Sequence, residues 1–331
     1  MFEPKQLIAR LPGARRCYRA VRYAPLVKRL STPLPNREAG NVFFHYNTRF
    51  DAEAVIRRHA VPRLDGRAGY VTNFLGVLIE PRFFPAALAQ RVGAVEALPI
   101  PANWHADIAE WAAALRAVEL AHGSFTMLEL GCGWGCWMCN TGVAARRAGL
   151  AIDLTGIEAD AGHIAFAEAA RQANGFPPAA FRVLRGVAAA ADGIALFPRD
   201  PRPGDQWGSR PLFGASNEAR RKAAAGGRFA EVPMIGLPGL LSTCSRVDLL
   251  HMDIQGGEAD LIEACIEPLN EKVAYVVIGT HSREIEGRLF ARFRASGWRL
   301  EIERPAILAL GRRGPSATVD GVQAWRNQRR R

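Results

Sequence analysis

The segment from Phe125 to Cys139 holds the residues whose types and spacing are best suited to chemistry. It is an apolar run that ends in a carboxylate, Glu129, and then carries a glycine at every second position, in the order Phe-Thr-Met-Leu-Glu-Leu-Gly-Cys-Gly-Trp-Gly-Cys-Trp-Met-Cys. Glycines let the chain turn sharply and bring backbone N–H groups against a ligand. The following residues, to about Arg147, favour a helix, whose N-terminus attracts a carboxylate or a phosphate. The segment therefore predicts a strand, a ligand-binding turn and a helix.

The charges around this turn indicate the ligand. Glu129 repels phosphate and suits an amino group, whereas the helix start suits a carboxylate, so the methionine end of S-adenosylmethionine (SAM) fits both. The dinucleotide fingerprint requires a glycine where this chain has Cys136, which argues against NAD. A second carboxylate, Glu158, follows the apolar run 151–157 and is expected to accept hydrogen bonds from ribose hydroxyls. The predicted SAM-binding residues are Glu129, Gly131, Gly133, Gly135 and Glu158.

Strand and helix patterns alternate from Asn103 onward, which predicts a mostly parallel sheet with helices on both faces. Asn103 is expected to cap the first helix, and the last strand, near 318–325, is expected to pair antiparallel. The expected strands are 125–130, 151–157, 181–185, 247–252, 273–279 and 298–303, and the expected helices are about 134–148, 161–174, 257–267 and 283–296.

Candidate catalytic residues follow two of these strands, because ligands of an open parallel sheet bind at the carboxyl ends of its strands. Methyl transfer from a sulfonium requires an aligned acceptor and removal of its proton. We expect His281 to be the general base, with Asp253 orienting it or taking the proton itself. In the alternative, Asp253 holds its own Gly-Gly turn and His281 is an ordinary strand-end histidine. Glu258 is expected to begin the next helix.

Two further groups of residues are candidates for the site. Asp253, Glu258 and His281 could hold a hard divalent ion, but their spacing is not diagnostic and no metal is predicted. The helix that enters strand 125–130 should place its N-terminal residues beside the cofactor. His105 and Asp107 are therefore candidates for the acceptor side, while Trp104 is expected to pack in the core.

The net charge of +11 comes from the two ends of the chain. Residues 1–29 carry eight Lys and Arg against one acid, residues 326–331 carry four Arg, and the charges between them cancel. This distribution is not the basic surface stripe of a nucleic-acid enzyme. It suggests either peripheral contact with an anionic membrane surface or solvated tails. No apolar run is long enough to span a membrane and no secretory signal is evident, so the expected location is cytoplasmic, with contact at the inner membrane face through the tails.

The 331 residues, 49% of them hydrophobic, can bury a full core. The predicted organisation is a basic, extended tail over 1–40, an α+β appendage over 41–102, a SAM-binding domain over 103–326 and a basic tail over 327–331. Residues 198–231 are rich in breakers and are expected to form a lid or insertion.

Three cysteines raise an alternative. Cys132, Cys136 and Cys139 have the Cys-x3-Cys-x2-Cys spacing with which radical-SAM enzymes hold an iron–sulfur cluster. Against it, Met138 stands where those enzymes commonly have an aromatic residue, the turn is already explained by backbone binding, and eight strand–helix units are not visible.

Three segments together resemble the FkbM-type branch of class I SAM-dependent methyltransferases: Glu129–Gly135, Val247–Glu258 and Val277–Ser282. The resemblance covers about 103–326. It implies a seven-stranded Rossmann-like sheet, O-methylation often of sugars or natural products, contact of SAM with the five residues named above, and a place for Asp253 in the active cleft. The chain departs from many class I enzymes after strand 181–185, where no acidic or amide side chain is present for adenine; backbone groups or Asp192 would hold it.

The function predicted from the sequence is SAM-dependent O-methylation of a hydroxyl on a glycan, a glycolipid precursor or a related metabolite. The alternatives are the radical-SAM enzyme and a SAM-binding or scaffold protein without catalysis, tethered through its basic ends. A nucleic-acid partner is not expected, and the oligomeric state is not predicted.

Overall fold

The computed structural model describes residues 41–312 and 314–330, so the basic tail predicted for 1–40 lies outside the described residues. The chain divides into two compact units, Met1–Phe44 and His45–Arg331. In the first unit the described residues form a short 3-10 helix, η1 (Val42–Phe44). All other elements belong to the second unit.

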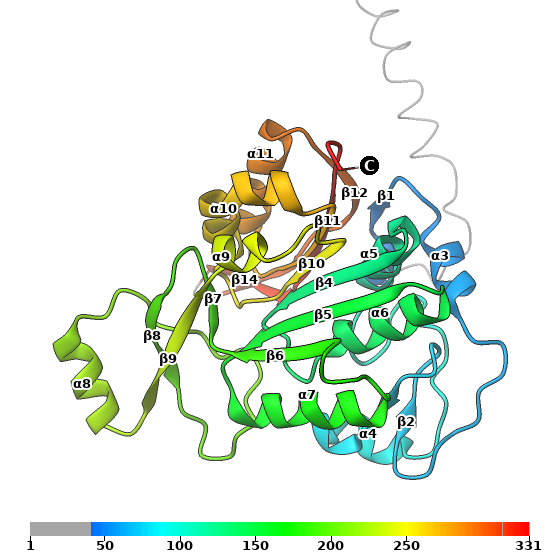
Figure 1. Ribbon diagram of the computed structural model, residues 1–331, viewed down its shortest axis with the longest axis horizontal. Helices are drawn as coiled ribbons and strands as arrows, with labels where there is room; N and C mark the ends of the chain where they lie inside the picture. Colours follow the sequence, from blue (N-terminus) through cyan, green and yellow to red (C-terminus); the bar gives the residue numbers. More distant parts are fainter. Residues whose placement is uncertain (1–40, 313, 331) are drawn as a thin grey trace, which may run out of the picture. The chain divides into compact units, whose positions relative to one another are not determined.

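The second unit is built on an eight-stranded sheet (Figure 1). In spatial order its strands are β1 (Asn47–Thr48), β12 (Trp298–Arg304), β15 (Gly321–Asn327), β11 (Tyr275–Thr280), β10 (Leu249–Met252), β4 (Ser124–Leu130), β5 (Ala151–Glu158) and β6 (Phe181–Arg185). The run from β11 to β6 is parallel, whereas β15 lies antiparallel between β11 and β12. The predicted Rossmann-like α/β fold is confirmed, and β1 adds an antiparallel edge to the seven expected strands.

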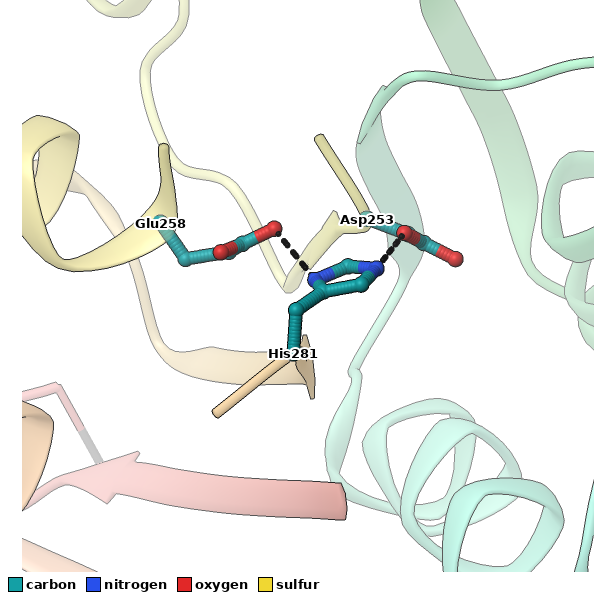
Figure 2. A group of neighbouring side chains, drawn as sticks. All are labelled: Asp253, Glu258 and His281. Atoms are coloured by element: carbon teal, nitrogen blue, oxygen red, sulfur yellow. Dashed lines mark ion pairs between the residues drawn. The ribbon is translucent and has the colours of Figure 1, made fainter. Parts of the chain in front are cut away.

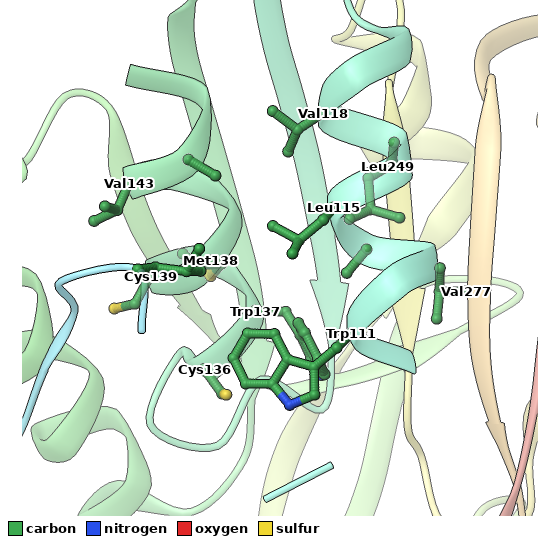
Figure 3. Packing of buried hydrophobic residues seen from close by; sticks show 14 of the residues in the cluster. Trp111, Leu115, Val118, Cys136, Trp137, Met138, Cys139, Val143, Leu249 and Val277 are labelled. Carbon is green, nitrogen blue, oxygen red and sulfur yellow. The ribbon is translucent and has the colours of Figure 1, made fainter. Parts of the chain in front are cut away.

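Helices cover both faces of this sheet, and each face has its own hydrophobic core. The main helices are α5 (Ile108–Leu120), α6 (Cys136–Arg147) and α7 (Ala161–Ala173) on one face, and α9 (Leu237–Ser242), α10 (Glu258–Lys272) and α11 (Arg283–Ala295) on the other. Successive strand residues alternate between the two cores: Leu249 packs beside α5, as Figure 3 shows, and Leu250 belongs to the core that α10 covers. This alternation explains why the central strands are apolar throughout.

Helix α5 begins four residues later than the sequence predicts. The carboxylate of Asp107 accepts hydrogen bonds from the backbone N–H groups of Ala109 and Glu110, at 2.8 and 3.2 Å, and caps the helix. Asn103 instead accepts from the N–H groups of His105 and Ala106 in the preceding turn. Both residue types can cap a helix, so composition alone did not separate them.

Residues 45–102 share the core of the sheet. Helix α3 (Ala52–His59) packs against α5 and buries Val55 and Ile56, and β1 pairs with β12. The predicted boundary at 102 remains a prediction. The other elements here are β2 (Val71–Thr72), β3 (Leu78–Ile79), η2 (Pro81–Phe83), α4 (Pro85–Leu88) and η3 (Ala89–Arg91).

The chain between β6 and β10 forms a small sheet of its own, in the order β7-β9-β8. Its elements are β7 (Val187–Ala189), β8 (Gly193–Pro198), α8 (Asn217–Ala225) and β9 (Phe229–Gly236). The predicted insertion 198–231 thus contains a helix and parts of two strands as well as the loop 199–216. Leu196 and Leu212 exchange backbone hydrogen bonds of 3.1 and 2.8 Å, which fix the end of that loop to β8.

Between β12 and β15 the chain makes an exposed hairpin of β13 (Ile307–Gly311) and β14 (Gly314–Val319). The strand expected near 318–325 therefore begins later, at Gly321. Asn327, assigned to the tail by the sequence, is the last residue of β15 and is buried. Among the described residues, no helix has the length and apolar character needed to cross a membrane.

Candidate functional site

A cavity of about 750 Å³ opens where β4, β5 and β10 end. Five segments contribute to its wall: residues 129–137, 157–160, 186–190, 206–211 and 253–257. Three of these segments, 129–137, 157–160 and 253–257, lie at the ends of β4, β5 and β10. Residues 186–190 contain β7, and residues 206–211 belong to the loop that follows β8. The cavity lies where the sequence places the ligand of an open parallel sheet.

The glycine turn forms one wall of this cavity. Gly131 has φ +76°, and a Cβ atom there would lie 2.2 Å from the carbonyl oxygen of Asp253. Gly133 has φ +53°, and a Cβ atom there would lie 2.8 Å from the Trp207 ring. Both positions require glycine for conformation and for space. The turn thus lines the cavity and touches two segments that are far away in the sequence.

Glu129 lies at the end of β4 and lines the cavity, although only 2% of it is exposed. Its carboxylate accepts hydrogen bonds from the backbone N–H groups of Trp137 (3.3 Å) and Met138 (2.9 Å), in the first turn of α6. Burial raises the pKa of Glu129 to about 7. A cationic ligand in the cavity would therefore stabilise the ionised form, as an ammonium group would.

Glu158 ends β5 and also lines the cavity. Its carboxylate accepts hydrogen bonds from the N–H groups of Ala159 (2.7 Å), Asp160 (2.8 Å) and Gly133 (2.9 Å). Burial alone would raise the pKa of this carboxyl, but His163 and these N–H groups outweigh it and hold the pKa below the usual value. Glu158 is therefore a charged acceptor beside the glycine turn, as the prediction for a ribose-binding residue requires.

Asp253, His281 and Glu258 form a chain of charged groups at the ends of β10 and β11 (Figure 2). The Nε2 atom of His281 lies 3.3 Å from Asp253 Oδ1, and its Nδ1 atom lies 3.0 Å from Glu258 Oε1. Burial lowers the pKa of the imidazole, but the two carboxylates outweigh this and raise the pKa to about 10. The two carboxylates therefore favour the protonated form of His281 at neutral pH.

This arrangement does not suit His281 as the general base. An imidazolium has no lone pair to accept a proton, both ring nitrogens already face carboxylates, and His281 does not line the cavity. Asp253 does line it, with 45% of its side chain exposed. Figure 2 also shows that the imidazole lies between the two carboxylates, each facing a different nitrogen. The imidazolium thus joins the two carboxylates, with one N–H group facing each of them.

Glu258 is the first residue of α10, as predicted, and is fully buried. Its Oε1 atom accepts hydrogen bonds from the N–H groups of Ile254 (3.1 Å) and Gly256 (3.0 Å). Asp253 itself is held on Oδ1 by the side-chain amide of Gln255, at 3.0 Å. Gln255 has φ +62°, a conformation that non-glycine residues rarely adopt. Glu258 and Gln255 therefore fix the turn that presents Asp253.

The structure separates the two acceptor-side candidates. His105 lines the cavity, its Nε2 atom lies 2.6 Å from Cys136 Sγ, and burial lowers its pKa to about 4, so the ring is neutral. Asp107 is buried, caps α5 and forms an ion pair with Arg304. It does not line the cavity, so that prediction is wrong for Asp107. Trp104 packs against Phe84, as expected for a core residue.

The three cysteines do not converge as a cluster site requires. Cys132 and Cys136 line the cavity, whereas Cys139 packs with Met138 in the core of α6 (Figure 3). Burial raises the pKa of all three thiols well above the usual value. Within the described part of the chain, the one group of three potential metal ligands is that of Asp253, Glu258 and His281. The radical-SAM alternative is therefore not supported.

Asp192 is not placed to bind adenine. Its carboxylate accepts a 2.7 Å hydrogen bond from the N–H group of Gly236 and does not line the cavity. Residues 186–190 do line it, which leaves their backbone as the candidate for that role. Arg210 and His251 also line the cavity, although the sequence gives neither of them a role in the site. The Nε2 atom of His251 lies 3.0 Å from Glu110 Oε1.

Comparison with known proteins decides the family. No family model matches the chain. A protein of Jannaschia sp. (strain CCS1) described as "Putative methyltransferase" is 45% identical over 259 residues, which are 78% of this chain and 92% of that protein. The chain belongs to this methyltransferase family. The expected class of enzyme, a methyltransferase, is confirmed.

Solved structures show more distant similarity. The methyltransferase FkbM from Methylobacillus flagellatus KT is 12% identical, with a TM-score of 0.40 over 62% of this chain and 45% of that chain. The C-terminal domain of precorrin-6Y C5,15-methyltransferase from Rhodobacter capsulatus is 13% identical, with a TM-score of 0.36 over 65% and 86%. Membership of the FkbM branch stays a prediction.

Proposed function

We propose that this methyltransferase takes its methyl group from SAM and transfers it to a hydroxyl of a glycan, a glycolipid precursor or a related metabolite. The observation that carries the proposal is the meeting of Glu129, Glu158 and Asp253 at one cavity beside the glycine turn. These carboxylates come from three different strand ends and have three different environments.

The chain's residues fit SAM at this cavity. The buried carboxyl of Glu129, whose pKa is about 7, would hold the ammonium group, and the start of α6 would face the carboxylate. Glu158 would accept hydrogen bonds from the ribose hydroxyls. SAM supplies, when bound, a methyl group on a positively charged sulfur that is a good leaving group. The protein's remaining task is to orient the acceptor and to take its proton.

Asp253 is the residue that we assign to the acceptor hydroxyl. Its Oδ1 atom is occupied by Gln255 and His281, and no hydrogen bond to its Oδ2 atom is seen among the described residues. Burial alone would raise its pKa, but His281 outweighs this and lowers it, so Asp253 is ionised at neutral pH. A weak base suffices, because the hydroxyl becomes acidic as its oxygen gains the methyl group. His281 is then a positioning residue that acts through Asp253.

Calorimetry with SAM tests the cofactor, and transfer of labelled methyl groups to fractionated cell extract tests the reaction. For Glu158→Ala we expect SAM binding to be abolished, because the ribose hydroxyls lose their acceptor. Glu168→Ala is the matched control, since Glu168 is an exposed residue of α7 outside the cavity. Unchanged affinity of the Glu158 variant would remove the ribose assignment. Absence of SAM binding to the unaltered protein would refute the proposed function.

A further inference from the structure

One arginine at the mouth of the cavity has no role in the function proposed above. Arg210 lines the cavity from the loop 199–216 and is exposed. In the part of the chain that the structure describes, no carboxylate lies within ion-pair distance of its guanidinium, whereas the nearby Arg202 pairs with Asp205 at 2.8 Å. A cation that borders a cavity without a partner is available to a ligand.

The guanidinium of Arg210 lies over Gly256. A Cβ atom built on Gly256 would lie 3.5 Å from its Cζ atom and 3.6 Å from both Nη atoms. These nearly equal distances show that the flat face of the guanidinium rests on Gly256. Its N–H groups, which lie in the plane, therefore point away from Gly256. Two residues further on, Leu212 is bonded to Leu196 and anchors the loop.

Arg210 lies beside the turn that carries Asp253. Gly256 belongs to the same turn as Asp253, and Gln255 of that turn borders the same loop: a Cβ atom on Gly208 would lie 3.1 Å from Gln255 Oε1. The cofactor's carboxylate is assigned to the beginning of α6, at Cys136. An anion at Arg210 would thus belong to the molecule whose hydroxyl meets Asp253.

We propose that the acceptor carries an anionic oxygen group, a phosphate or a carboxylate, and that Arg210 binds it at the cavity mouth. A planar guanidinium with free N–H groups matches two oxygens of such a group at once. This inference rests on the proposed function, because it assumes that the acceptor enters beside Asp253. It narrows the acceptor from any hydroxyl compound to a negatively charged one.

Titrations with simple anions test this assignment. Sodium phosphate and sodium acetate are added separately, at constant ionic strength, to the protein with and without S-adenosylhomocysteine, and binding is followed by calorimetry. We expect at least one anion to bind, with a dissociation constant in the millimolar range, and about tenfold more weakly to Arg210→Gln. Arg210→Lys should retain part of the affinity. Arg299→Gln, which changes an exposed arginine outside the cavity, should bind like the unaltered protein.

Three results would overturn the inference. The first is that neither anion binds at concentrations up to about 50 mM, above which binding is too weak for a specific site. The second is that the anion binds equally well to Arg210→Gln and to the unaltered protein. A loss of S-adenosylhomocysteine affinity in Arg210→Gln would also overturn it, since Arg210 would then serve the cofactor's carboxylate. Failure of the unaltered protein to bind S-adenosylhomocysteine contradicts the proposed function instead, and the titration without it still measures the anion site.

Discussion

Replacing His281 by glutamine should destabilise the protein in a way that depends on pH. The imidazolium of His281 lies between the carboxylates of Asp253 and Glu258, at 3.3 and 3.0 Å. Glutamine keeps a polar side chain of similar length but carries no charge, so the fully buried Glu258 loses its counter-charge. The variant should still bind SAM, because His281 does not line the cavity.

The size of the effect follows from the pKa of His281, which is raised from 6.5 to about 10. At 1.36 kcal/mol per pKa unit this corresponds to roughly 5 kcal/mol of folding free energy. Because 45% of the Asp253 side chain is exposed, water screens part of the interaction, and we expect roughly 2–4 kcal/mol. A raised pKa means that this stability is fully present below pH 6.5 and is lost as the pH rises toward about 10.

Urea unfolding of the unaltered protein and of His281→Gln, at pH 6, 8 and 10.5, measures this difference. The gap between the two free energies of unfolding should shrink as the pH increases, whereas His122→Gln, which changes an exposed histidine, should show no such trend. The rate of methyl transfer gives a second readout: without His281 the pKa of Asp253 rises, so the acid limb of the rate profile should move to higher pH. If the difference between the two free energies of unfolding is the same at pH 6 and at pH 10.5, His281 is not an imidazolium that pairs with Asp253 and Glu258.

Two further predictions concern the carboxylates of the cavity. Asp253→Asn should retain SAM affinity and lose about 10²- to 10⁴-fold in turnover, because the amide cannot take the proton; single-turnover transfer measures this, and full activity would exclude Asp253 as the acceptor of the proton. SAM affinity should increase as the pH rises through about 7, the pKa of Glu129 in the free protein, because only the ionised carboxylate pairs with the ammonium group. Calorimetry from pH 5.5 to 8.5 measures this trend, Glu129→Gln should abolish it, and a profile equal in both proteins would contradict the assignment.

The sequence predicted the part of the fold that local patterns encode. The strand at β5 and the helix at α7 were expected within one residue of their observed ends, because apolar runs and helical periodicity are local signals. The two-residue strand β1 could not be expected, because its place in the sheet depends on pairing with β12, more than 250 residues away. Where α5 begins was also missed, since Asn103 and Asp107 are equally good caps in composition.

The sequence predicts which residues meet at the site, but it does not predict which of them are protonated. Spacing alone brought Asp253 and His281 to one edge of the sheet, because both follow parallel neighbouring strands. The decisive fact, that Glu258 approaches the second nitrogen of His281, depends on how α10 begins in three dimensions. The sequence does not indicate a role for Arg210, because an arginine in a loop cannot be distinguished from an ordinary solvated charge until its neighbours are known.

Gly131 of the glycine turn packs closely against the carbonyl group of Asp253. The glycine turn and the turn that carries Asp253 are therefore joined, and neither can shift without the other. The loop 199–216 touches the same framework, because the Trp207 ring lies 2.8 Å from the place of a Cβ atom on Gly133, while its far part is joined to β8 at the Leu196–Leu212 bridge. Evolution can therefore rewrite residues 209–213 of that loop, and with them the choice of substrate, while Trp207 and the glycine turn that it touches stay as they are. A library of sequence changes confined to this loop is the place to begin redirecting the enzyme toward other acceptors.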